Sequence, residues 1–175
     1  GNMNTFKKAD ILIPQKEIDY KKWSVVACDQ YTSQPDYWQR VKDAVEDAPS
    51  TLNLVYPEVY LSEGDARIEK INSAMADYEE NGVFEEVLSS LIYVERTMAN
   101  GKTRKGIVGC IDLEDYDYQK GSKSKIRATE GTVLERIPPR VKIRENATLE
   151  LPHVLLLMND SEKTVIENIE KGELI

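Results

Sequence analysis

Three short runs of apolar residues predict strands in the first third of the chain. Residues 11–13 and 24–27 are compact and apolar, a pattern typical of buried strands. Residues 51–56 alternate between apolar and polar side chains and are partly β-branched, which also favours a strand. We therefore expect three strands in this part of the chain.

Two amphipathic stretches predict helices. The first covers residues 35–47; it begins with a proline and follows Thr32 or Ser33, either of which can cap a helix. The second begins near Ser62, its expected cap, and ends before Gly82. Its apolar residues repeat at three- and four-residue spacing, at Ile68, Ile71, Met75 and Tyr78.

A hairpin is the clearest feature of the middle of the chain. Residues 90–97 and 105–112 both have strand patterns and flank Asn100-Gly101, a strong signal for a tight turn between two strands. Further on we expect a helix over about 140–147 introduced by Pro138-Pro139, a strand at 153–158 and a helix at 161–171. Strands and helices that alternate around one hairpin predict an α+β (or α/β) class, with a mixed sheet, the hairpin at 90–112 and helices packed on it.

Length and composition fit one globular domain over residues 1–175. Hydrophobic residues make up 41% of the chain and charged residues 31%, enough for a core that needs no disulfide or metal. No apolar run approaches the roughly 20 residues of a membrane span, and the first residues lack a signal-peptide core, so we expect a cytoplasmic protein that binds no membrane. The net charge of −8 makes DNA an unlikely partner.

Charge is unevenly distributed along this acidic chain. Residues 119–144 contain eight basic and two acidic residues, a net charge of +6, so the rest of the chain carries −14. A basic segment within an acidic protein is the feature of the composition that most directly indicates a binding function.

The chain has few cysteine and histidine residues, the side chains that bind soft metals or act as thiol and imidazole groups in catalysis. Cys28 and Cys110 lie in apolar runs, so we expect two buried free thiols. His153 opens an apolar run, where it is either a strand-end residue or a catalytic base. Two cysteines and one histidine nearly exclude a Cys/His zinc site, and we predict no metal-ligating residues.

The basic segment holds our first candidate site. Arg127, Glu130 and Thr132 bring a guanidinium, a carboxylate and a hydroxyl into six residues. Arg140 and Arg144 follow on the predicted helix, one turn apart and on one face. Guanidinium forks and a helix N-terminus both favour phosphate, so these residues predict an anion site. The alternative is that the arginines are solvated or paired with nearby acids such as Glu145.

Two further clusters are candidates. Asp29 lies in a polar loop between a predicted strand and a predicted helix, where open sheets often bind ligands, and is either a base, a metal ligand or an ordinary turn residue. The acidic segment 114–117 could bind Mg²⁺ or form a solvated loop.

Several segments, taken in order, resemble the domain of unknown function 1015. They are residues 27–38 (ACDQYTSQPDYW), the stretch from Tyr78 to Gly82, the strand pair within 92–112, residues 113–116 (LEDY), and the series Glu130, Thr132, Arg140 and Pro152. This bacterial family is often labelled as related to ParB-type partition proteins, a superfamily that includes nucleotide hydrolases and free-serine kinases. Full-length members are longer, so the resemblance implies the N-terminal part of a protein whose C-terminal domain would be a partner.

The chain departs from the family pattern at both candidate sites. Many members have Pro-Pro-Tyr-Asp where this chain has residues 27–30, and His-Glu-x-x-Thr or a close variant where it has residues 129–132. The missing histidine removes an acid–base group that the family pattern would supply.

The resemblance and the basic segment together give two functional hypotheses. The first is an enzyme domain for a small phosphorylated metabolite or nucleotide, with phosphoryl transfer near serine metabolism as its most concrete form and with Mg²⁺ and a nucleotide as the expected cofactors. In it Glu130 and Asp29 are the candidate catalytic residues, and the phosphate ligands are Arg127, Thr132, Arg140 and Arg144. The second is a ParB-like nucleotide- or nucleic-acid-binding module, or a regulatory domain, without turnover.

Overall fold

The computed structural model describes residues 6–111, 114, 116, 117, 119, 121, 123, 126, 127 and 134–151, with the backbone alone for Tyr116, Ile126 and Arg127. These residues divide between two compact units. We call the one drawn from 12–85 and 132–152 the helical unit, and the one whose described residues lie in 1–11 and 86–131 the strand unit.

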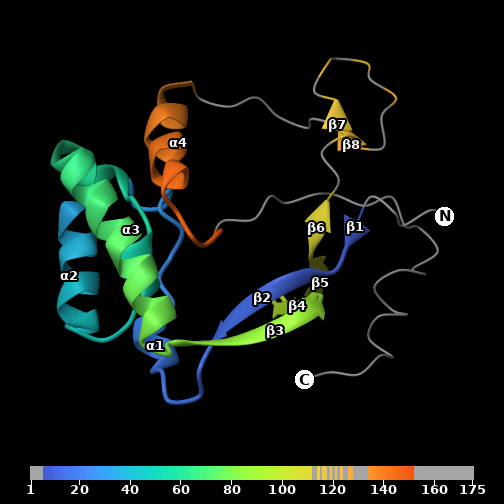
Figure 1. Ribbon diagram of the computed structural model, residues 1–175, viewed down its shortest axis with the longest axis horizontal. Helices are drawn as coiled ribbons and strands as arrows, with labels where there is room; N and C mark the ends of the chain where they lie inside the picture. Colours follow the sequence, from blue (N-terminus) through green and yellow to red (C-terminus); the bar gives the residue numbers. More distant parts are fainter. Residues whose placement is uncertain are drawn as a thin grey trace. The chain divides into compact units, whose positions relative to one another are not determined.

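Four helices form the helical unit (Figure 1): α1 (Tyr20–Trp23), α2 (Pro35–Val45), α3 (Asp65–Glu80) and α4 (Ile137–Glu145). The Asp19 carboxylate caps α1 by accepting a hydrogen bond of 3.0 Å from the Lys21 backbone N–H. The three predicted helices that fall on described residues therefore exist, although α2 and α4 end two residues earlier than their patterns indicate.

Two clusters of buried side chains hold the helical unit together. In the first, Trp38 and Val45 of α2 pack on Leu52. In the second, Ile71 and Met75 of α3 pack on Leu54 and on partly buried residues of α4 and its C-terminal extension, Ile143, Ala147, Leu149 and Leu151. The apolar face read from the sequence of α3 is thus the face that α4 covers.

Residues 51–56 do not form the predicted strand, and neither do residues 24–27. Thr51–Leu54 is a 3₁₀ helix, η2, which begins at buried Ser50, whose hydroxyl oxygen accepts a hydrogen bond from the Leu52 N–H at 3.1 Å. Residues 24–27 are irregular, and Val25 packs against the first buried cluster instead. Leu52 and Leu54 are buried by packing on the helices, and Val25 is partly buried in the same way, which requires no strand partner.

The start of α3 also differs from the prediction. Ser62 lies in a 3₁₀ helix, η3 (Glu58–Glu63), and Gly64 occupies the N-cap position without a side-chain cap. Gly64 has φ +56°, a left-handed conformation that favours glycine and allows the sharp change of direction between η3 and α3.

Strands in the described residues pair two by two, in an α+β arrangement. The pairs are β1 (Phe6–Lys7) with β6 (Cys110–Ile111), β2 (Ala9–Pro14) with β3 (Phe84–Ser90), β4 (Ile92–Thr97) with β5 (Thr103–Val108), and β7 (Tyr116–Asp117) with β8 (Ile126–Arg127). The predicted hairpin is confirmed: β4 and β5 are antiparallel, with Thr97 opposite Thr103 next to the Asn100-Gly101 turn. The described residues contain no helix that is long and apolar enough to cross a membrane.

Glycine and cysteine positions in the strand unit complete the fold. A Cβ added to Gly109 would lie 2.6 Å from the Lys7 carbonyl oxygen, so close packing requires glycine there. Both cysteines are free, as predicted. Cys28 is only partly buried, and Cys110 is exposed. The expectation of two buried thiols is therefore wrong, because the apolar runs around Cys28 and Cys110 leave both residues at least partly accessible to solvent.

Candidate functional site

The loop between α1 and α2 is held in one conformation by α2. The Trp38 indole N–H donates a hydrogen bond of 3.1 Å to the Tyr31 carbonyl oxygen, and Trp38 is fully buried. The Tyr31 ring stacks on that of Tyr37, with ring centroids 4.0 Å apart. Tyr31 itself has φ +51°, an unusual conformation for a bulky residue that these contacts maintain.

Cys28 and Asp29 lie in this loop, and the start of α4 approaches it. Partial burial raises the pKa of the Cys28 thiol, whereas the positive charge of Arg140 lowers it and the negative charges of Asp29 and Glu58 raise it. The charges of Arg140, Asp29 and Glu58 therefore all act on one thiol. We call Cys28, Asp29, Glu58, Arg136 and Arg140 the loop–helix cluster.

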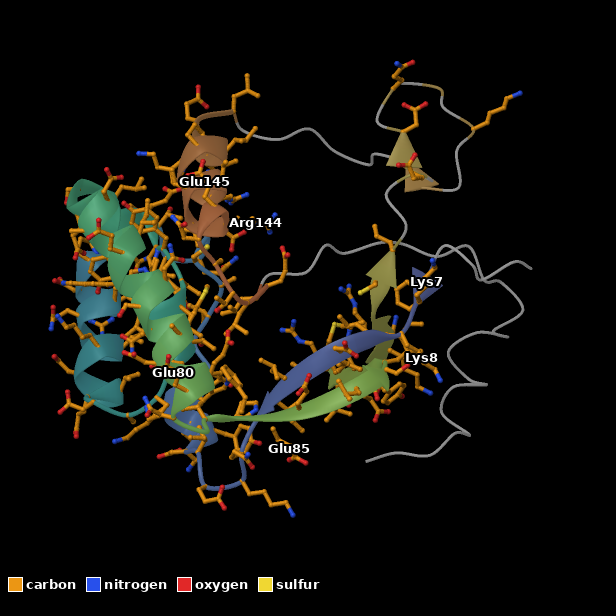
Figure 2. The ribbon with its side chains drawn as sticks, viewed as in Figure 1. Lys7, Lys8, Glu80, Glu85, Arg144 and Glu145 are labelled. Carbon is orange, nitrogen blue, oxygen red and sulfur yellow. The ribbon has the colours of Figure 1, made fainter. Side chains whose placement is uncertain are left out.

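Ion pairs distinguish the basic residues of this region. Arg136, which precedes α4, pairs with Glu58 of η3 at 3.1 Å, and Lys142 pairs with Asp65 at 3.1 Å. Arg144, on α4 with Glu145 beside it (Figure 2), pairs with Glu150 at 2.9 Å. Arg140 is exposed and makes no ion pair with any described residue. Arg140 is thus the cation of α4 that is free to meet a ligand.

The N-terminus of α4 offers fewer backbone donors than an ordinary helix. Its first three residues are Ile137, Pro138 and Pro139, and proline has no N–H. Of the four N–H positions that a helix leaves without an intrahelical acceptor, the N-cap Arg136 and the first three residues, only Arg136 and Ile137 have an N–H. An anion here would be held by the Arg140 side chain more than by the helix end.

Arg67 fixes η3, and with it Glu58. Its guanidinium Nη2 donates to the carbonyl oxygens of Leu52 at 3.1 Å and Val55 at 3.3 Å, and its Cζ lies 4.5 Å from the centre of the Tyr60 ring. Partial burial raises the pKa of Tyr60, which Arg67 partly opposes. Arg67 therefore joins the end of η2 to η3 and helps to set the position from which Glu58 acts.

The predicted site residues divide into three groups. Asp29 and Arg140 both act electrostatically on the Cys28 thiol. Arg144 lies one turn further along α4 and is paired with Glu150, so an acid other than the expected Glu145 neutralises it. Glu130 and Thr132 lie outside the described residues, and only the backbone of Arg127 is described, in β8 opposite Asp117. His153 and residues 153–171 also lie outside the described part.

Sequence reasoning missed Glu58, Arg136 and the electrostatic role of Cys28. Glu58 and Arg136 meet only through the fold, and no local pattern marks either of them. Among the described residues there is no group of three or more His, Cys, Asp or Glu side chains that could hold a metal ion. Asp29 and Glu58 are the two carboxylates of the loop–helix cluster, and Arg136 already neutralises Glu58, which leaves Asp29 as the carboxylate that could ligate a metal ion.

A hollow of about 220 Å³ lies elsewhere in the helical unit. It is bordered by α1, α2 and the chain between them, and its lining residues include Lys22, Val25, Tyr37 and Val41. It contains none of the predicted site residues and is smaller than the roughly 300 Å³ of the smallest usual ligand pockets. We therefore take the loop–helix cluster as the candidate site, because it is there that charged side chains act together.

Comparison with known families identifies the chain. Residues 12–174 match the family described as "Protein of unknown function (DUF1015)". The chain belongs to this family. The match confirms the resemblance seen in the sequence and extends over both units of the structure. No curated protein and no solved structure matches the chain.

Proposed function

We propose that the chain is a cytoplasmic enzyme domain that acts on a small phosphorylated metabolite or nucleotide, with Arg140 as the phosphate-binding residue of the loop–helix cluster. The observation that carries the proposal is the difference between Arg140 and its neighbours. Arg136, Lys142 and Arg144 are each neutralised by a carboxylate within 3.1 Å, whereas Arg140 has no such partner among the described residues.

The chemistry of the cluster supports phosphoryl transfer more than thiol chemistry. Burial raises the pKa of Cys28, so its thiol is protonated at neutral pH and is a poor nucleophile. Asp29 is exposed and next to the thiol, where its carboxylate can accept a proton from an attacking hydroxyl or bind Mg²⁺ alongside phosphate oxygens. Arg140 would then neutralise charge on the phosphate that is transferred.

The finer parts of the proposal come from the basic segment and the family resemblance. Glu130, Thr132 and Arg127 are proposed as functional residues of the basic segment: a second carboxylate, a hydroxyl that orients a phosphate oxygen, and a further cation. A substrate related to serine metabolism, and a C-terminal domain of the same protein as partner, are proposed on the same grounds. Duplex DNA remains an unfavourable ligand, because 31 acidic residues outnumber 23 basic ones.

A binding panel tests this proposal. Phosphate, phosphoserine, ADP, ATP and CTP, each with Mg²⁺, are titrated calorimetrically into the wild type, Arg140→Ala and Arg40→Ala. Arg40 is exposed on α2 and, like Arg140, makes no ion pair with a described residue, so its variant matches the change of charge. Loss of one charge-assisted contact should weaken binding about 10- to 150-fold in Arg140→Ala alone.

Two outcomes would contradict the proposal. One is equal binding by wild type and Arg140→Ala. The other is the absence of binding by every phosphate ligand both to this chain and to the longer protein. Binding that depends on Arg140 without any turnover of the ligand would favour the second function, a nucleotide-binding module.

A further inference from the structure

The two faces of the hairpin β4–β5 differ in charge: one has an acidic and a basic residue opposite each other, and the other has two basic residues. On one face Glu95 lies opposite Lys105, an attractive pair, and the Thr97 and Thr103 hydroxyl oxygens are 3.1 Å apart in a hydrogen bond. This face is complementary across the two strands. Side chains alternate along each strand, so the residues between these belong to the opposite face.

Two arginines lie opposite each other on that second face. The register pairs Arg96 of β4 with Arg104 of β5. Like charges directly opposed across two strands destabilise a sheet unless a counter-charge accompanies them. Both arginines are exposed, and neither side chain makes an ion pair or hydrogen bond with another described residue. We call this side of the hairpin the arginine face.

The turn places a third cation close to this pair. Lys102 directly follows the Asn100-Gly101 turn, and its backbone N–H donates a hydrogen bond of 3.0 Å to Asn100 Oδ1. Arg104 is two residues further along the chain. The end of the hairpin near the turn therefore concentrates positive charge in a chain whose net charge is −8.

A shallow apolar strip continues from the arginines along the same face. Val94 lies opposite Gly106 and Ile92 opposite Val108. Val94 is 43% exposed and Ile92 37% exposed, and a Cβ added to Gly106 would meet no atom within 4 Å. The strip is thus open, and it is flat at the glycine nearest to the arginine pair.

We propose that the arginine face binds a phosphate group between Arg96 and Arg104, with the flat or apolar part of the same ligand resting on Gly106 and Val94. Two guanidinium forks match the nearly two negative charges and the several acceptor oxygens of a phosphate monoester. This site uses other residues, in the other unit, than the proposed site at Arg140. The phosphate is carried either by a small-molecule monoester or by the backbone of a single-stranded nucleic acid, where each phosphodiester has one negative charge and would share the two arginines.

The first test compares ligands and charge-removing variants. Inorganic phosphate, phenyl phosphate and a short oligouridylate are titrated into the full chain at low salt, while the arginine Nε–Hε signals are followed by nuclear magnetic resonance. We expect phenyl phosphate to bind more tightly than phosphate and to shift the signals of Arg96 and Arg104. Arg96→Gln and Arg104→Gln should each weaken binding at least about tenfold, and Arg40→Gln should not. Arg140→Ala should retain this binding, which separates it from the proposed function.

A second variant makes stability and binding change in opposite directions. Arg104→Glu replaces the repelling pair by an attractive one, so it should raise the melting temperature of the hairpin while it abolishes phosphate binding. Tighter binding of the oligouridylate than of phenyl phosphate, with the same dependence on both arginines, would identify the backbone as the source. Equal binding by wild type and both glutamine variants, or no shift of either signal with any ligand, would overturn the proposal.

Discussion

The helical unit and the strand unit differ in what their residues are buried against. The buried hydrophobic side chains found in the described residues all lie in the helical unit, at Trp38, Val45, Leu52, Leu54, Ile71, Met75 and Val83. Both units expose large apolar residues, such as Leu134 at 73% in the helical unit and Leu88 at 63% in the strand unit, but the described residues of the strand unit include no buried hydrophobic side chain. Hydrophobic burial thus accounts for the first unit, whereas backbone pairing accounts for most of the described structure of the second.

The same comparison distinguishes the two candidate sites. The loop–helix cluster has a loop whose backbone is fixed by a buried tryptophan, so its charges are positioned by a core. The arginine face is positioned by cross-strand register alone. A two-stranded hairpin is marginally stable by itself. A ligand or partner that bridges β4 and β5 should therefore stabilise the hairpin more than a ligand at the loop–helix cluster stabilises the helical unit.

Removing the side chain of Trp38 should produce the largest effect. Trp38→Ala leaves a cavity in the first cluster and deletes the hydrogen bond to Tyr31, which together should lower the free energy of unfolding by about 3–5 kcal/mol. Leu88→Ala, on an exposed strand position, should change it by less than about 0.5 kcal/mol. Urea unfolding followed by far-ultraviolet circular dichroism, which reports on the helices and strands of both units, measures both variants.

A third variant, Trp38→Phe, separates the loss of apolar volume at position 38 from the loss of the hydrogen bond. Trp38→Phe should recover part of the lost stability, since it restores much of the apolar volume but not the hydrogen bond. If Leu88→Ala proved as damaging as Trp38→Ala, the division between a buried and an exposed unit would be wrong.

Substituting Gly109 and Gly106 in turn compares a closely packed glycine of the strand unit with an open one. In Gly109→Ala the new Cβ would meet the Lys7 carbonyl oxygen at 2.6 Å and Leu91 Cδ2 at 2.8 Å, so the strands must shift, at about 1–3 kcal/mol. Gly106→Ala meets nothing within 4 Å and should be neutral or stabilising by up to about 1 kcal/mol. Amide hydrogen exchange should show faster exchange in β1 and β6 for Gly109→Ala only.

These variants also discriminate between global and local change. A loss of protection in α3 as well as in β1 and β6 would mean that the two units unfold together. Similar exchange in both glycine variants would contradict the close approach of Lys7 to Gly109.

What the sequence predicts well is local. The hairpin follows from Asn100-Gly101 between two strand patterns, and α2 and α3 follow from apolar spacing and from Pro35. The failures have non-local causes. Residues 51–54 are a 3₁₀ helix partly because the Ser50 backbone N–H donates to the Tyr78 hydroxyl of α3 at 3.1 Å, a contact that no pattern near residue 50 reveals.

The candidate site shows the same limit. Arg140 and Asp29 could each be chosen from residue type and local context, but their common effect on Cys28 depends on how α4 meets the loop. The pairing of Arg144 with Glu150 was foreseen only as a general alternative, and the pairing of Arg136 with Glu58 was not foreseen at all. Charge patterns along a sequence identify cations; the fold decides which of them remain unpaired.

The smallest expected effect is a pH dependence that originates at Cys28. Burial raises the pKa of its thiol above the ordinary value of 9.0, so the folded protein holds this proton more tightly than the unfolded chain does. The stability that results is fully present below pH 9 and is lost as the pH rises through the higher pKa of the folded state. Because Cys28 is only partly buried, solvent screening keeps the effect small.

Measuring this effect requires the other thiol to be removed and the charges around Cys28 to be varied. In a Cys110→Ser background, thiolate absorbance gives the pKa of Cys28 in the folded protein, and a Cys28→Ser variant gives the pH dependence that remains without it. Arg140→Ala should raise the pKa of Cys28 further, since it removes the charge that stabilises the thiolate, and Asp29→Asn should lower it. A pKa of Cys28 that is unchanged in both variants would place Arg140 and Asp29 away from the thiol, and would remove the electrostatic basis of the loop–helix cluster.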